Sequence, residues 1–256
     1  MSAVLNISSY LFVPLTDTLA LRESIRSQAT ERHLKGTVLL AEEGINLFLA
    51  GPAGAVRGFV AWLKQDARFA PLEPKESWSD EVPFGKLLVK VKREIIRMNH
   101  PTIRPHAGRA PAVDAKTLAR WLDAGVDDDG RPVVTLDTRN AFEVGYGKFR
   151  NAIDWNIGKF TEFPRQVAAH RDELTGKRVV SYCTGGIRCE KAAIYMAEAG
   201  IEHVVQLEGG ILKYFEEVGG RHYEGGCFVF DERESLDPSL APSVAPPLLS
   251  APSTSE

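Results

Sequence analysis

The segment KRVVSYCTGGIRCEKAAIYMAEAG, residues 177–200, decides the fold of the C-terminal half of this chain. It opens with an apolar run of strand length, passes through a glycine-rich turn and continues with helical spacing up to Gly200. A short apolar strand that leads directly into a helix is typical of a parallel sheet covered on both faces. We therefore expect an α/β domain in which Cys183 ends a buried strand, at the edge where such sheets hold reactive groups.

The flanking segments continue this alternation of strands and helices. Asp114 is the expected N-cap of the first helix. Together these segments predict a largely parallel sheet. Strands are expected at PVVTLD (132–137), NAIDWNI (151–157) and EHVVQLEGG (202–210), and helices over 114–124, 163–174, 190–199 and 211–219.

The N-terminal half has a different order of elements. Thr16 or Asp17 is the expected N-cap of its first helix, and Glu42, Glu43 and Gly44 form an expected hairpin turn. The order strand–helix–strand–strand–helix–strand predicts a ferredoxin-like α+β domain. Strands are expected over 4–13, twice within GTVLLAEEGINLFLAG (36–51) and in KLLVKVKREII (86–96), and helices over 16–33 and 55–64.

Changes in amino-acid composition along the chain indicate where the domains begin and end. The polar stretch MNHPTIRPHAGRAP (98–111) is rich in proline and is typical of a linker. The end of the chain consists mainly of Pro, Ser and Ala, a composition that does not support a packed core. We predict an N-terminal domain at 1–98, a linker at 99–111, a catalytic domain at 112–233 and a disordered tail at 234–256.

The bulk composition indicates an ordinary globular protein. The 256 residues are 44% hydrophobic with a formal net charge of -3, so a nucleic-acid-binding surface must be local. Three cysteines are too few for a disulfide framework and favour a reducing, cytoplasmic location. The chain lacks the features of a signal peptide, and no apolar run approaches the ~20 residues of a membrane span.

The loop after Cys183 predicts an anion-binding cradle. Gly185 and Gly186 have no Cβ, so backbone N–H groups of Thr184–Ile187 can point inward, beside the positive end of the following helix. The anion at the centre would be the Cys183 thiolate, whose pKa should fall below the free value of about 8.5. The plainer interpretation is that Cys183 is only a small buried residue at a strand end.

The size of the loop bears on its chemistry. Cys183 and Arg188 enclose four residues, fewer than the five of cysteine-dependent phosphatases. A smaller cradle fits one or two sulfur atoms better than a phosphoryl group, which favours thiol or sulfur-transfer chemistry. Arg188 either contacts an anionic substrate or braces the loop. Cys189 is either a resolving thiol or a packed side chain, and Cys227 is interpreted as structural.

Three segments of the C-terminal half resemble a rhodanese-like domain: LDTRNAFE (136–143), YCTGGIRCEKA (182–192) and LEGGI (207–211). With GTVLLAEEGINLFLAG and GCFVFDER (226–233), the chain resembles the bacterial TrhO family of oxygen-dependent tRNA uridine 34 hydroxylases. The resemblance implies an acylphosphatase-like domain followed by a rhodanese-like domain. It also implies that Cys183 is the active-site cysteine and persulfide carrier, with Cys189 as the second cysteine of the motif.

The resemblance implies an oxidoreductase that makes 5-hydroxyuridine at the wobble position of tRNA, with molecular oxygen as co-substrate. No membrane or DNA partner is implied. Lys148 stands where many rhodanese-like domains have histidine, and the tail lacks the cysteines of some family members, so no zinc role is expected there. Two other functions stay open: a small-molecule sulfurtransferase, and a non-enzymatic binding module on a rhodanese shell.

A local excess of positive charge is the expected tRNA contact. Residues 86–109 hold seven Lys and Arg against the single acid Glu94, and we assign Lys92, Arg93, Arg97 and Arg104 to substrate binding. A solvated strand face followed by a basic linker would give the same pattern. Trp155, Phe160 and Tyr214 are candidate stacking partners for the unpaired base, and Asp137, Arg139 and Glu143 either orient loops or form ordinary ion pairs.

The sequence gives no account of oxygen activation. No HExxH, no two-His-one-carboxylate spacing and no dinucleotide fingerprint occurs, so neither a metal nor a cofactor is expected. One hypothesis is that the Cys183 thiolate adds reversibly to C6 of uracil and activates C5. The other is that a persulfide reduces oxygen.

Overall fold

A computed structural model of the chain describes residues 3–243. The chain divides into two compact units, Met1–Arg109 and Ala110–Glu256. The expected linker therefore falls mostly within the first unit. It contains the short 3-10 helix η2 (Pro105–Ala107), and Ile103 and Pro105 are buried.

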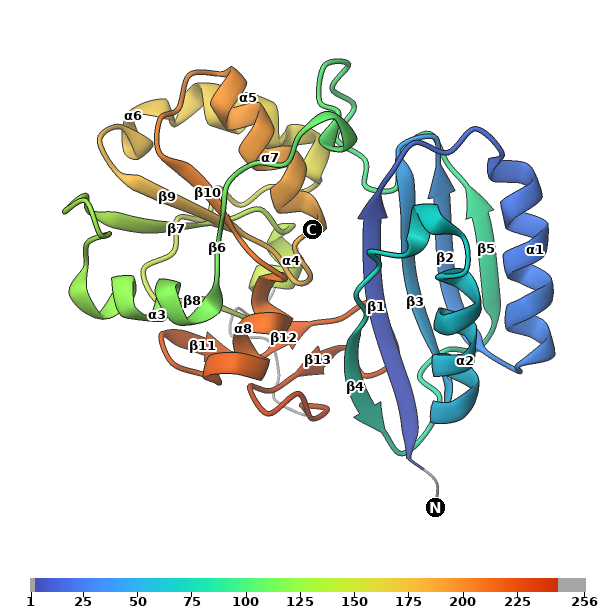
Figure 1. The fold of residues 1–256 in the computed structure, drawn as a ribbon. Helices are drawn as coiled ribbons and strands as arrows, with labels where there is room; N and C mark the ends of the chain where they lie inside the picture. The colour runs from blue at the N-terminus through green and yellow to red at the C-terminus, as the bar shows by residue number, and fades with distance from the viewer. Residues whose placement is uncertain (1–2, 244–256) are drawn as a thin grey trace, which may run out of the picture. The chain divides into compact units, whose positions relative to one another are not determined.

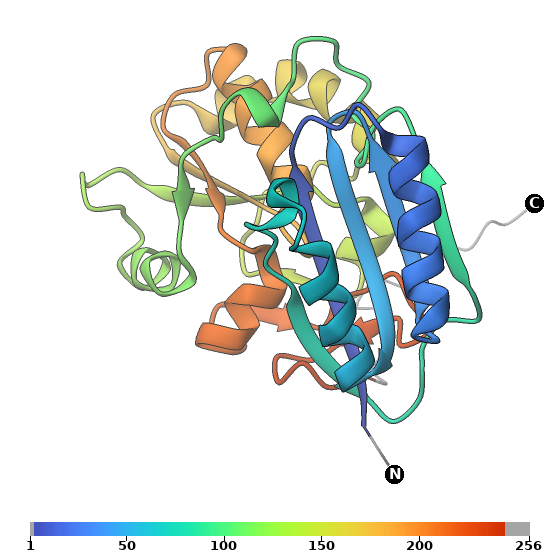
Figure 2. The ribbon, with the colours of Figure 1, turned by 45° about the vertical axis from the view of Figure 1, so that its right-hand side comes forward.

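The N-terminal unit is a five-stranded sheet with two helices on one face (Figures 1 and 2). The strand order is β4-β1-β3-β2-β5, and the pairs are antiparallel except β2 with β5, which is parallel. The strands are β1 (Val4–Phe12), β2 (Lys35–Ala41), β3 (Gly44–Pro52), β4 (Lys75–Ser79) and β5 (Leu87–Val91), and the helices are α1 (Thr18–Glu31), α2 (Ala53–Leu63) and the 3-10 helix η1 (Ala67–Phe69).

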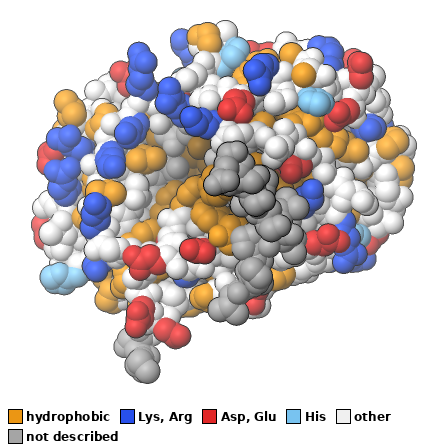
Figure 3. All heavy atoms as spheres, turned by 180° about the vertical axis from the view of Figure 1, so that it is seen from behind, with side chains coloured by type: hydrophobic (Ala, Val, Ile, Leu, Met, Phe, Trp, Pro, Cys, Tyr) orange, Lys and Arg blue, Asp and Glu red, His pale blue; other side chains and the backbone are white. Residues whose placement is uncertain are grey.

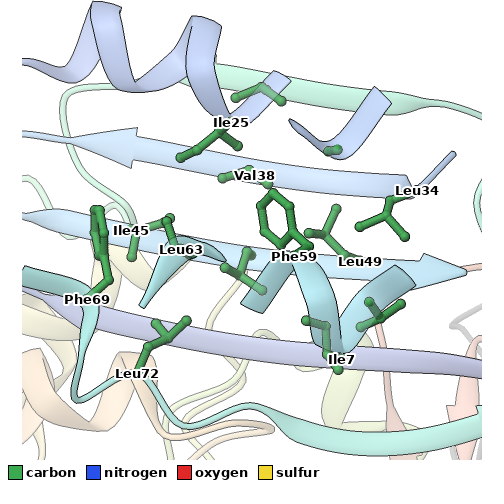
Figure 4. Packing of buried hydrophobic residues seen from close by; sticks show 14 of the residues in the cluster. Ile7, Ile25, Leu34, Val38, Ile45, Leu49, Phe59, Leu63, Phe69 and Leu72 are labelled. Carbon is green, nitrogen blue, oxygen red and sulfur yellow. The ribbon is translucent and has the colours of Figure 1, made fainter. Parts of the chain in front are cut away.

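The core of this unit lies between the sheet and its helices. Figure 4 shows Ile25 of α1 and Phe59 of α2 packed among Val38 and Leu49 of the strands. These residues have no exposed surface, as expected from the helical spacing of the apolar residues in α1 and α2. Ala41 pairs with Gly44, so Glu42 and Glu43 form the two-residue turn that the sequence predicts.

The ferredoxin-like arrangement is completed by a strand that the sequence did not reveal. The expected last strand at 86–96 is β5, which adds to β2 at one edge, whereas β4 pairs with β1 at the other. Each residue of β4 is at least partly exposed, so KESWS carries no apolar run to mark it. Asp17 is the N-cap residue of α1, one of the two expected positions, but its carboxylate binds Arg68 and makes no capping hydrogen bond.

The C-terminal unit has the expected parallel sheet, in the order β6-β10-β9-β7. Figure 1 shows α5, α6 and α7 on one face of this sheet and α3 and α8 on the other. Asp114 caps α3 as predicted, because its carboxylate accepts the Thr117 N–H at 2.8 Å. The elements are β6 (Ala112–Val113), β7 (Val133–Asp137), β9 (Arg178–Tyr182), β10 (Val204–Leu207), α3 (Ala115–Ala124), α4 (Ala141–Val144), η3 (Phe160–Glu162), α5 (Phe163–Ala169), α6 (Arg171–Leu174), α7 (Ile187–Glu198) and α8 (Gly210–Val218).

Two expected elements differ in this unit. The helix expected over 163–174 is broken at His170, whose backbone (φ -118°, ψ 22°) leaves the helical region and separates α5 from α6. The strand expected over 151–157 is reduced to a single bridge between Ile153 and Leu136. The strand nearby is instead β8 (Gly147–Phe149), which pairs with β11 (Tyr223–Gly225).

Ordered structure continues past the expected domain end at residue 233. Strand β12 (Cys227–Phe228) pairs with β13 (Ser235–Leu236), and both residues of β13 are buried. Residues 234–243 of the expected tail are therefore part of the fold, and 244–256 lie outside the described residues. Within the described part of the chain, no helix combines the length and apolarity that crossing a bilayer requires.

Candidate active site

Cys183 lies directly after β9, an inner strand of the parallel sheet, as the sequence predicts. The chain turns through Thr184, Gly185 and Gly186 and enters α7 at Ile187. Gly186 has a φ of 98°, a conformation that glycine adopts without strain, and its N–H donates to Cys183 Sγ at 3.1 Å. The glycines therefore bring backbone donors to the sulfur.

A second helix holds the outer side of this loop. The first N–H groups of α8 donate to the loop carbonyls, Ile211 N to Cys183 O at 2.9 Å and Leu212 N to Thr184 O at 3.1 Å. Gly210 makes this approach possible, because a Cβ there would lie 2.4 Å from Cys183 O. Gly210 was not among the expected site residues, although a glycine pair at the start of a helix was a usable signal.

The environment of Cys183 favours its thiolate. Burial raises the pKa of this thiol, but the Cys189 thiol, the Arg188 charge and the N–H groups of Arg188 and Gly186 together lower the pKa to about 5. Cys183 has no exposed surface, so these donors act with little competition from water. A thiolate that exists at neutral pH is a nucleophile, whereas a buried neutral thiol is inert.

Arg188 is braced by an acid of the neighbouring helix. Both of its terminal nitrogens bind the Glu143 carboxylate, at 2.5 and 2.6 Å, and both side chains are buried. A second buried pair lies at the end of β7, where Arg139 binds Asp137 and donates to Gly147 O at 2.6 Å. In this structure Arg188 therefore braces the loop and acts on the sulfur through its charge.

The other two cysteines are neutral thiols. Burial and the adjacent Cys183 sulfur raise the pKa of Cys189 well above its ordinary value, and Thr138 Oγ1 lies 3.8 Å from Cys189 Sγ. Burial raises the pKa of Cys227 to about 12. A thiol with a lowered pKa thus stands near a thiol with a raised pKa, as a nucleophile and a resolving thiol require.

The loop is open on one side. Thr184, Gly186 and Ile187 are buried, whereas Gly185 is partly exposed and a Cβ built on it meets nothing within 4 Å. Thr184 Oγ1 donates to Phe228 O at 3.3 Å, which fixes the loop to β12. Gly185 is thus the one partly exposed residue between Cys183 and α7.

The structure brings together some of the expected site residues and not others. Residues 183–189 form the loop in the C-terminal unit, whereas Lys92, Arg93, Arg97 and Arg104 are exposed in the N-terminal unit. Figure 3 shows Lys and Arg side chains (blue) gathered over the surface of this unit, on the left of that view. In the described part of the chain, no group of three or more His, Cys, Asp or Glu could hold a metal ion.

The prediction that three aromatic residues stack on the unpaired base is wrong for two of them, which are buried. Tyr214 is fully buried, its ring lies 4.8 Å from that of Phe149, and its hydroxyl donates to Arg221 O. Phe160 is buried against Phe163. Trp155 is partly exposed, but its ring stacks on His170 with centroids 5.4 Å apart, so one of its faces is already covered.

Comparisons with known proteins agree with this two-part architecture. Residues 4–95 match the UPF0176 acylphosphatase-like domain, and residues 116–217 match the rhodanese-like domain. A protein from Bordetella avium named tRNA uridine(34) hydroxylase is 66% identical over 240 residues, which covers 94% of this chain and 99% of that one. Proteins of the same name from Delftia acidovorans (66% identical, 94% of this chain, 92% of that one) and Bordetella petrii (64%, 96% and 97%) are similarly close.

Proposed function

This chain belongs to the tRNA uridine(34) hydroxylase family, and we propose that it hydroxylates C5 of the wobble uridine of tRNA with the Cys183 thiolate as nucleophile. The observation that carries the chemistry is the setting of Cys183 Sγ, which is buried, accepts the Gly186 N–H at 3.1 Å and lies near the Arg188 charge, and these groups lower its pKa. A tRNA substrate would place the protein in the cytoplasm.

The Cys183 thiolate can add to the uracil ring and so activate C5. Addition of Cys183 Sγ to C6 forms a C–S bond and moves the C5–C6 π pair to C5, where the O4 carbonyl stabilises it as an enolate. C5 then becomes nucleophilic toward an oxidant. Once oxygen has been added at C5, loss of the C5 proton and departure of the Cys183 sulfur restore the double bond and release the base.

The proposed oxidant is molecular oxygen. One of its atoms enters the base, and reduction of the other to water requires two electrons from a reductant. Uridine, O₂ and two thiols give 5-hydroxyuridine, water and one disulfide, so one oxygen atom enters the base and the other leaves as water. Cys183 and Cys189 each shift the pKa of the other, and together they hold the two thiols that one turnover consumes. An external thiol would then reduce the pair for the next turnover.

The alternative function, sulfur transfer from thiosulfate to a small thiol, is less well supported. A thiosulfate dianion needs a cation that is free to bind it, and both terminal nitrogens of Arg188 are already held by Glu143. Purified protein separates the two functions. Efficient formation of thiocyanate from thiosulfate and cyanide, with tRNA left unchanged, would favour the sulfurtransferase.

The proposal is tested by nucleoside mass spectrometry of tRNA from a strain that lacks this protein. The wild-type chain should restore 5-hydroxyuridine and the nucleosides made from it, and Cys183→Ser should not. Cys227→Ala is the matched control, because it removes a buried cysteine whose thiol is neutral, and it should restore the modification. Restoration by Cys183→Ser would remove the thiolate from the proposal.

A further inference from the structure

Four aromatic side chains form a cluster beside the reactive loop. Phe228 is its centre, with ring centroids 5.2 Å from Phe142, 5.1 Å from Tyr146 and 5.2 Å from Phe230. The rings of Phe142 and Phe230 are nearly perpendicular to Phe228, at 86° and 89°. We call Phe142, Tyr146, Phe228 and Phe230 the aromatic cluster.

The aromatic cluster is joined to the loop at both ends. The backbone oxygen of Phe228 accepts the hydroxyl of Thr184, the residue after Cys183. Phe142 precedes Glu143 on α4, so the same short helix holds Arg188 inside and presents an aromatic ring outside. Phe142 is therefore adjacent in sequence to the residue that holds Arg188, and Phe230 lies two residues from the one that accepts the Thr184 hydroxyl.

The outer rings of the cluster are exposed, which is unusual for phenylalanine. Phe142 is 53% exposed and Phe230 is 49% exposed. Among the residues that the structure describes, the other exposed large hydrophobic side chains are Leu19, Trp78 and Val126, none of which belongs to the cluster. Two exposed phenylalanines on one cluster mark a binding surface rather than scattered apolar residues.

We infer that Phe142 and Phe230 stack on the nucleobases that flank the target uridine, an inference that rests on the proposed function. To reach a buried sulfur, the uridine must leave the base stack of the anticodon loop, and its neighbours then lose a stacking partner. Aromatic side chains replace that partner in single-stranded RNA recognition without reading the sequence. The aromatic cluster provides two exposed rings beside the segment that holds the reactive cysteine.

The charges around the cluster agree with a neutral aromatic ligand. Tyr146 donates to Glu234 and Arg233 holds Asp231, while the exposed Glu232 is a third acid in this segment. Bases are uncharged and tolerate this setting, whereas a phosphate at the same place would meet carboxylates. The cluster therefore fits the bases of the substrate, and the exposed cations of the N-terminal unit fit its backbone.

The test measures KM and kcat of full-length protein on an anticodon stem-loop RNA with uridine at position 34. Phe142→Ala and Phe230→Ala should each raise KM about tenfold, and the aromatic replacements Phe142→Tyr and Phe230→Tyr should retain most of the affinity. Phe142→Leu keeps apolar area without a ring face and should resemble Phe142→Ala. Leu19→Ala, at an exposed apolar residue of α1, is the matched control and should change neither constant.

Alkylation of Cys183 in each variant shows whether the loop is intact, because the thiolate reports on the loop and not on stacking. Phe142→Ala and Phe230→Ala should keep the wild-type rate of alkylation. Unchanged KM in both variants, or full rescue by Phe142→Leu, would overturn the stacking inference and leave the proposed function standing. A wild-type chain that makes no 5-hydroxyuridine would instead overturn the proposed function itself.

Discussion

At the scale of single residues, Gly210 of α8 lies so close to the reactive loop that it leaves no room for a side chain. Its φ is +66°, and an added methyl group would lie 2.4 Å from Cys183 O and 2.7 Å from Gly186 N. Gly210→Ala should therefore lower the free energy of unfolding by about 3 kcal/mol, from backbone strain plus overlap with backbone atoms that cannot move aside. Denaturant unfolding measures this loss.

Gly125→Ala is the matched control for that change. Gly125 has a similar φ of +72°, but a Cβ there meets nothing within 4 Å. Its replacement should cost about 1–2 kcal/mol, which is the strain alone. Equal losses for the two variants would contradict the close approach of α8 to the loop.

The thiolate itself depends on few side chains. Cys183, Arg188 and Cys189 stand in a short stretch of sequence, so their proximity and the low pKa of Cys183 were predictable. The partner of Arg188 was not, because Glu143 lies 45 positions earlier and only the fold brings the two together. Sequence spacing reveals local clusters, and long-range pairs need the tertiary structure.

At the scale of elements, the short strand β13 is part of the catalytic unit. Its pairing with β12 holds the strand whose Phe228 carbonyl accepts the Thr184 hydroxyl. A chain that ends at residue 233 should melt several degrees below one that ends at residue 243, because it loses this pairing and the burial of Leu236. Thermal unfolding followed by circular dichroism measures the difference.

The same truncation should also loosen the loop. Cys183 in the shorter chain should react faster with iodoacetamide, since the sulfur is fully buried in the intact unit. Identical melting temperatures and rates for the two chains would show that β13 contributes nothing.

Elements with strong apolar patterns were predictable, and short or polar ones were not. The strands β1, β2, β3, β7, β9 and β10 carry apolar runs and lie where the sequence places them. By contrast, β4 has only partly exposed or exposed residues, and β8 and β13 have three and two residues. Such strands are held by their neighbours, so their own sequence carries little signal.

At the scale of the whole molecule, chemistry and substrate binding are assigned to different units. Each group that lowers the pKa of Cys183 lies in Ala110–Glu256, whereas Lys92, Arg93, Arg97 and Arg104 lie in Met1–Arg109. Replacing these four cations by Gln in the full chain should weaken tRNA binding. The slope of log affinity against log salt should become shallower by about 0.7 for each phosphate that is no longer neutralised. The alkylation of Cys183 should stay unchanged.

A second variant separates local from general charge effects. Four other exposed lysines, at positions 35, 64, 116 and 159, are replaced by Gln as the matched control. This variant loses the same formal charge and should bind tRNA more tightly than the first. Equal weakening by the two variants would show that the run from Lys92 to Arg104 is only a solvated surface.

The account rests on one ionised sulfur, and the pH dependence of its alkylation tests this most directly. The rate of iodoacetamide reaction at Cys183, followed by peptide mass spectrometry of the full chain, rises as the thiol loses its proton. Half of the maximal rate is predicted near pH 5, with Cys189 and Cys227 silent at neutral pH. In the double variant Arg188→Gln with Glu143→Gln, the midpoint should move to higher pH because the positive charge beside the sulfur is gone. A wild-type midpoint near the free cysteine value of about 8.5 would contradict the account.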